Sequence, residues 1–218
     1  MDTKTSSVTD IAAELDRANT LPSGKLCLEF ANTADWHAAP EPEEHLTAYA
    51  DLVGWARQFD LLTSGEAETL LAQAAAHPAL AAEFHAWAIE LREAIYRIFA
   101  AVAHGAAPSP ADVAILNEAL PQAFNGPALV ADNGGFTWRY HTGAGLDRML
   151  WPVLRSAAML LTSPDLDRVG QCADDRGCGY LFFDSSRNRS RRWCDMGSCG
   201  NRAKARRHQT RHRTALPA

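Results

Sequence analysis

The 218-residue sequence lacks two features that mark exported and membrane proteins. No apolar run approaches the roughly eighteen residues of a membrane span, and the opening residues, Met1 to Ser7, are polar where a secretory leader carries an apolar segment. These absences predict a cytoplasmic protein without membrane contact. Because thiols stay reduced in that compartment, the five cysteines are expected to be free to bind a metal.

The signatures of common enzymes are missing as well. The sequence contains no P-loop, no dinucleotide-binding fingerprint, no His-Glu-x-x-His pair and no Gly-x-Ser-x-Gly elbow. Its histidines are scattered singly through the body, where a lone histidine is more often a surface or packed residue than a catalytic one. We therefore expect no catalytic residues and no enzymatic activity.

Four of the five cysteines form two close pairs near the C-terminus. Cys172 and Cys178 make the first pair, and Cys194 and Cys199 the second. Two such pairs on a connecting segment are typical of a tetrahedral zinc site. Two disulfides or buried thiols are the alternatives, and the absence of a leader argues against disulfides. A set that includes His208 fits less well, because fewer residues separate it from Cys199 than in the usual two-Cys, two-His finger. We predict one structural zinc bound by the four cysteines.

The segment around these cysteines predicts a small treble-clef or zinc-ribbon-like finger. Residues 179–193 read as a strand, a polar turn and a returning strand, and the basic run after Cys199 favours a helix. Phe182, Phe183 and Trp193 are expected to pack over the zinc site rather than stack on bases.

Charge is divided unevenly along the chain. Residues 1–168 carry 10 Lys and Arg against 22 Asp and Glu, a net charge of −12, whereas residues 169–218 carry 11 Lys and Arg against 4 Asp, a net charge of +7. Such a split predicts an acidic body with a basic module that contacts phosphate. The candidate nucleic-acid-binding residues are Arg187, Arg189, Arg191, Arg192, Arg202, Lys204, Arg206, Arg207 and Arg211. DNA is the expected partner. RNA, an acidic protein and a second copy of the chain in a homodimer are the alternatives.

Two stretches resemble a known family. Residues 191–202, ending in Cys199, Gly200, Asn201 and Arg202, resemble the CGNR zinc finger. Residues 26–36 are similar to the opening of the ABATE domain that accompanies such fingers, with Glu29 where an aspartate is expected. The resemblance implies a stress-linked transcription regulator that binds DNA through its finger.

The predicted organisation is a flexible N-terminus over 1–20, an ABATE-like α-rich domain over 21–165, and the finger over 166–213. The fold is mainly α (α+β), with a helical body that carries one β-hairpin. Periodicity and capping signals place the elements of the body as follows. Helices are expected over 26–33, from Glu43, from Ser64 to about His77, from Pro78 to about His104, from Ser109 to Pro121, and over 146–161 with a kink at Pro152, and a hairpin over 128–141. For 26–33 a strand is the alternative, because Leu26, Leu28 and Phe30 alternate.

A ligand pocket is a further hypothesis for the body. Asn32, Asp35 and Trp36 follow the ABATE-like motif in a predicted turn, where binding residues concentrate. The alternative is that Trp36 ends the helix and packs into the core. Cys27 is expected to be a small buried residue rather than a nucleophile. The body would then sense a ligand or partner, and the finger would bind the nucleic acid.

Overall fold

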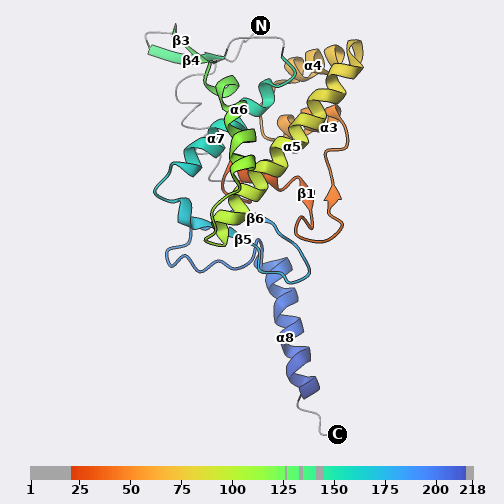
Figure 1. Ribbon diagram of the computed structural model, residues 1–218, viewed down its shortest axis with the longest axis vertical. Coiled ribbons are helices and arrows are strands. Elements are labelled where there is room, and N and C mark those ends of the chain that lie inside the picture. Colours follow the sequence, from red (N-terminus) through yellow and green to blue (C-terminus); the bar gives the residue numbers. More distant parts are fainter. Residues whose placement is uncertain (1–20, 126, 133–134, 141–144, 215–218) are drawn as a thin grey trace.

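A computed structural model describes residues 21–125, 127–132, 135–140 and 145–214 (Figure 1). The predicted flexible segment 1–20 lies outside them. The body contains helices α2 (Leu26–Ala31), α3 (Tyr49–Gln58), α4 (Ser64–Ala76), α5 (Pro78–Ala103), α6 (Pro110–Asn125) and α7 (Trp151–Leu161), and the short 3-10 helix η1 (Arg148–Leu150). Its strands are β1 (Ala34–Asp35) paired with β2 (Glu43–Glu44), and β3 (Pro127–Asp132) paired with β4 (Gly135–Tyr140), both antiparallel.

The C-terminal part continues with η2 (Leu166–Arg168), β5 (Val169–Gln171), β6 (Leu181–Phe183), the π-helical turn η3 (Met196–Gly200) and α8 (Asn201–Thr214). The predicted fold class is confirmed: a mainly helical body with a hairpin over β3 and β4, followed by a small finger.

Helix α5 is the axis of the body. Helices α2, α3, α4 and α6 all pack against it, and α2 and α6 also pack against α7. Leu91, Ile95, Ile98 and Phe99 on α5 are fully buried, as is Phe30 on α2. Each such side chain contributes about 1.5–3 kcal/mol when it leaves water. Cys27 is fully buried in the same core, as expected, and burial raises the pKa of its thiol to about 12.

Local capping signals placed several helix ends correctly. Thr63 accepts the Glu66 N–H, and the Glu66 carboxylate accepts the Thr63 N–H in return, so α4 begins where the capping box predicts. Pro78 opens α5 because its missing N–H has no partner in a first turn. Gly105, with φ +67, follows the end of that helix.

The predicted start of α3 at Glu43 is wrong. Glu43 and Glu44 form β2 instead, opposite Asp35 and Ala34, and the helix begins at Tyr49. The cause is Asp51, whose carboxylate accepts the backbone N–H groups of Thr47 and Ala48 and so fixes the helix start there.

Two predictions about proline are also wrong. Pro121 does not end α6, which continues to Asn125. Ala119 and Ala123 on either side of it are buried, and this packing holds the helix together across the missing hydrogen bond. Pro152 is not a kink, because it lies in the first turn of α7 after η1, where a proline is tolerated.

The strand pairing of the finger differs from the prediction. Strand β6 pairs antiparallel with the preceding strand β5, in the register Val169↔Phe183 and Gln171↔Leu181. The predicted second strand of the hairpin is absent, since residues 184–193 form no strand. The Asp184 carboxylate accepts the N–H groups of Ser186 and Arg191, which closes this segment into a loop.

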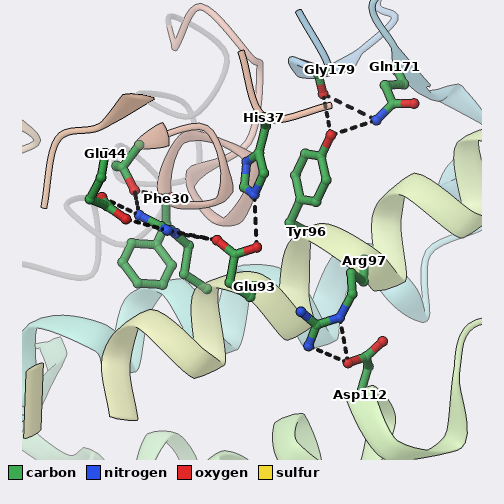
Figure 2. A network of polar contacts seen from close by, with 11 residues as sticks. Phe30, His37, Glu44, Glu93, Tyr96, Arg97, Asp112, Gln171 and Gly179 are labelled. Carbon is green, nitrogen blue, oxygen red and sulfur yellow. Dashed lines mark hydrogen bonds and ion pairs between the residues drawn. The ribbon is translucent and has the colours of Figure 1, made fainter. Parts of the chain in front are cut away.

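The hairpin of β5 and β6 is built into the body. Its Val169 and Leu181 belong to the same buried cluster as the α5 core residues. Figure 2 shows Tyr96 of α5 with its hydroxyl toward the finger, where it donates to the Gly179 carbonyl at 3.1 Å and accepts from Gln171 at 2.7 Å. Helix α8 projects away from the body at the lower end of α5 (Figure 1).

Candidate metal centre and basic face

The four cysteines predicted as zinc ligands come together. Cys172 follows β5, Cys178 precedes Gly179, and Cys199 lies in η3 just before α8. All four Sγ atoms lie within 4.8 Å of one another, with Cys178 and Cys194 at 3.7 Å and Cys194 and Cys199 at 3.5 Å. Tetrahedral zinc with Zn–S bonds of about 2.3 Å separates its sulfurs by about 3.8 Å. A disulfide needs about 2.05 Å, so the cysteines are free thiols and the cluster fits a metal.

The thiols influence one another strongly. Hydrogen bonds from Cys178 and Cys194 lower the pKa of Cys172, whereas hydrogen bonds with Cys172 and Cys178 raise the pKa of Cys194. Four thiolates this close repel one another unless a cation lies between them. The donor set therefore suits one structural zinc, and because it supplies all four ligands it leaves no position for a reacting water.

Asp174 organises the positive charge around the cluster. Its side chain is fully buried and accepts hydrogen bonds from Arg176, Arg202 and Arg206. Burial raises the pKa of Asp174, but the arginine contacts outweigh it and hold the pKa well below its usual range. Arg202 also lies 2.8 Å from Cys199 Sγ, where its charge offsets that of the thiolates.

The sequence missed the role of Asp174. Arg202 contacts the thiolate of Cys199, and its carboxylate partner is Asp174. Two adjacent acidic residues, Asp174 and Asp175, inside a basic segment were the available signal. Asn201 braces the helix start, since its amide donates to the Gly197 carbonyl at 3.0 Å.

Eight of the nine candidate nucleic-acid residues fall into two groups. The first group is engaged inside the finger: Arg189 pairs with Asp167, Arg191 donates to the Trp193 and Cys194 carbonyls, and Arg202 and Arg206 bind Asp174. The second group is exposed: Arg187, Arg192, Lys204 and Arg207. Arg192 lies over the Trp193 ring, whereas Arg187, Lys204 and Arg207 form no ion pair with any described residue. The Arg211 side chain lies outside the described part.

The aromatic residues of the finger have structural surroundings. Phe182 is fully buried under the Arg191 guanidinium, which lies 4.4 Å from its ring centre. Phe183 is half-buried against Lys25 of the body. Trp193 is half-buried at the edge of a groove of about 590 Å³ that also includes Ser186, Arg192 and Met196.

The three residues of the hypothetical ligand pocket have different partners. The Asn32 amide exchanges two hydrogen bonds of 2.8 Å with the main chain of Leu181 in the finger. Asp35 is exposed and pairs with His45 at 3.1 Å. Trp36 follows β1 with φ +55, opens a turn in which its carbonyl accepts the Ala39 N–H, and lies against Arg176 and Arg202. Two of the three side chains therefore contact the finger.

Comparison with protein families agrees with these features. Residues 24–164 match the family model ABATE, described as "Putative stress-induced transcription regulator". The chain belongs to the ABATE family. Residues 168–212 match the CGNR zinc finger, so the resemblance seen in the two motifs is confirmed. The search of curated proteins finds no match.

The two family matches can be placed on the structure of this ABATE chain. The motif at the start of the ABATE match forms α2 and the turn after it, and the CGNR finger carries the four-cysteine zinc site. Within the described ranges, every helix is too short or too polar to cross a membrane.

Proposed function

We propose that this ABATE chain is a zinc-dependent nucleic-acid-binding protein, and that it regulates transcription by binding DNA through its CGNR finger. The observation that carries the proposal is a set of exposed basic side chains on the finger. Arg187, Lys204 and Arg207 extend from a zinc-supported scaffold without a carboxylate partner among the described residues. Free guanidinium and ammonium groups on a rigid base suit the phosphates of a nucleic-acid backbone.

The proposal divides the basic residues by task. Arg191, Arg202 and Arg206 brace the finger, because their guanidinium groups bind carbonyls or Asp174. Arg187, Lys204 and Arg207, with Arg192 beside Trp193, contact the phosphates. Charge reversal at Arg206 would therefore disturb the scaffold, and Arg207 is the cleaner position for testing contact.

Zinc in this proposal is structural and the chain has no catalytic role. The body acts as the regulatory part and responds to a ligand or partner. Because Asn32 and Trp36 are already engaged by the finger, a signal acting through that interface fits better than a separate pocket formed by these residues.

Fluorescence anisotropy of the zinc-loaded full chain against mixed-sequence duplex DNA, over a salt series, tests the proposal. Contacts from three or four basic residues predict a slope of log affinity against log salt of roughly −3 to −4. Replacing Lys204 and Arg207 by alanine is expected to reduce that slope by about 2. The matched control is Arg57→Ala on α3 of the body, which removes an exposed arginine and should leave the slope unchanged.

The same assay separates the alternatives. Binding to structured RNA but not to duplex DNA would replace DNA by RNA as the partner. A complex displaced by polyglutamate at low concentration but not by excess duplex would indicate a module that docks on an acidic protein. Absence of any binding at low salt would overturn the proposed function. Sedimentation of the free chain tests the homodimer.

A further inference from the structure

The finger touches the body through backbone groups packed unusually close together. The knuckle (residues 172–180) lies against the corner (residues 34–39) that follows α2. The Ala38 N–H donates to the Gly177 carbonyl at 3.2 Å. Gly177 and Gly179 have φ of +92 and +68, and a Cβ on either would lie 2.8 and 2.5 Å from the backbone nitrogens of Ala39 and Ala38. The contact therefore requires glycine at both positions.

Buried side chains of the body hold the strand that follows the knuckle. Asn32 is 8% exposed and binds both the N–H and the carbonyl of Leu181. The Tyr96 hydroxyl donates to the Gly179 carbonyl. The His37 ring stacks on the Tyr96 ring, with ring centres 3.5 Å apart (Figure 2). The knuckle is thus fixed to α2 and α5 at several points.

Trp36 extends this contact from the knuckle to α8. Its ring lies 4.9 Å from the Arg176 guanidinium on the knuckle and 5.5 Å from that of Arg202 in the first turn of α8. Both arginines also bind the buried Asp174, and Arg202 reaches Cys199 Sγ. Trp36 therefore contacts Arg202 at the start of the basic helix, and Arg202 in turn contacts the metal ligand Cys199.

The geometry of α8 makes its start important. The helix has 14 residues, which corresponds to a length of about 21 Å. A tilt of about 20° at its base would move its far end by about 7 Å, enough to separate basic residues from the phosphates they contact. Arg202 in the first turn of α8 contacts both Trp36 and Asp174.

We propose that Trp36 is a positioning residue, through which the ABATE body sets the direction of α8 and protects the zinc site. The corner and the finger then form one coupled unit: a signal that moves the corner changes contact with nucleic acid, and occupation of the finger stabilises the corner in return. The expected change in nucleic-acid contact rests on the proposed function, whereas the expected effects on the zinc site and on the start of α8 do not.

The test compares Trp36→Ala, Trp36→Phe and the control Asp35→Ala in the full zinc-loaded chain. Asp35 lies in the same corner but is exposed and contacts His45 rather than the finger. Zinc transfer to a chromophoric chelator is expected to be about tenfold faster in Trp36→Ala, in line with losses of outer contacts at metal sites. Trp36→Phe retains an aromatic face and should restore most of the wild-type rate, and Asp35→Ala should match the wild type.

Amide hydrogen exchange provides the second readout. In Trp36→Ala we expect loss of protection over 174–181 and 201–206, with residues 91–99 of α5 unchanged. Arg176→Met serves if Trp36→Ala does not fold, because Arg176 is exposed and its removal takes one guanidinium from Trp36 while Asp174 keeps Arg202 and Arg206. It should change exchange over 201–206 in the same direction. Wild-type zinc transfer and exchange in Trp36→Ala, or in Arg176→Met where that variant replaces it, would overturn the inference.

Duplex affinity provides the third readout and separates the two proposals. Trp36→Ala should weaken duplex binding about threefold to thirtyfold, the range that loss of a cation–π contact produces. Faster zinc transfer in a chain that never binds nucleic acid would support the coupling and overturn the proposed function. Unchanged zinc transfer in a chain that binds duplex normally would overturn the coupling alone.

Discussion

The body and the finger hold their shapes by different means. The body buries a continuous apolar cluster along α5, whereas the finger buries few large apolar side chains, Phe182 and Leu181 among them. A segment of this size cannot exclude enough water to be stable by burial alone. It relies instead on four thiolates around zinc and on arginines gathered by Asp174. Metal chemistry can thus replace core volume where a chain is short.

Loss of a zinc ligand should give the largest effect. Cys199→Ser is expected to remove a large part of the zinc-binding free energy, which for structural sites is about 10–16 kcal/mol. Metal analysis should show less than one zinc per chain, and hydrogen exchange should show the finger unprotected. Cys27→Ala is the matched control, since this cysteine lies in the body core and the variant should keep its zinc. One tightly bound zinc per chain in Cys199→Ser would show that the finger does not depend on all four thiolates.

A cavity in the core of the body should lower the free energy of unfolding without affecting zinc binding. Ile95→Ala removes a fully buried side chain from α5 and is expected to reduce the free energy of unfolding by about 2–5 kcal/mol. Urea denaturation measures this change. Leu80→Ala on the same helix, where the side chain is 54% exposed, should remain within about 0.5 kcal/mol of the wild type. Equal losses in the two variants would show that α5 is not the axis of the core.

The polar network beneath the corner should make the body sensitive to pH. Glu93 accepts hydrogen bonds from Arg92 and lies 2.9 Å from His37 Nε2. Burial raises the pKa of Glu93, but the contacts with His37 and Arg92 outweigh it and lower the pKa from 4.5 to about 2. Because the folded pKa is depressed, the stability gained is fully present above pH 4.5 and is lost as the pH falls through 2.

Glu93→Gln should therefore lower the free energy of unfolding by about 1–3 kcal/mol at pH 7, and the difference from wild type should narrow as the solution is acidified. Denaturant titrations at several pH values measure it. The exposed neighbour Glu90, replaced by glutamine, is the control, and it should behave like the wild type at every pH. A difference that stays constant down to low pH would contradict the assignment.

Removal of a helix cap should have the smallest effect. Thr63→Ala leaves the Glu66 N–H without its acceptor and is expected to cost about 1 kcal/mol. Thermal unfolding should show the body weakened while the zinc content stays at one per chain. Thr69→Ala, in the interior of the same helix, should lie within about 0.5 kcal/mol of the wild type.

Local chemistry made much of the fold predictable. Thr63 with Glu66, Pro78 and Gly105 act on their immediate neighbours, and the helix ends they mark agree with the structure. The four cysteines could be assigned because zinc imposes a spacing that sequence alone reveals.

Contacts between residues far apart in the sequence could not be predicted from the periodicity of the sequence. The partner of β6 depended on Asp184 closing the following loop, and the end of α6 depended on packing around Pro121. Asn32 and Trp36 were recognised as notable residues, but their partners in the finger are about 140 or more residues away along the chain. Periodicity carries no information about such pairs.

The buried state of Cys27 has a practical consequence for work with this molecule. Its thiol is closed to solvent and is hard to ionise, so thiol-specific reagents meet no reactive cysteine in the folded body. Every accessible sulfur of a cysteine then belongs to the zinc cluster. A simple thiol count on the intact chain would therefore report metal occupancy directly: protected when zinc is bound, four equivalents when it has been stripped, and a fifth only after the body itself has opened.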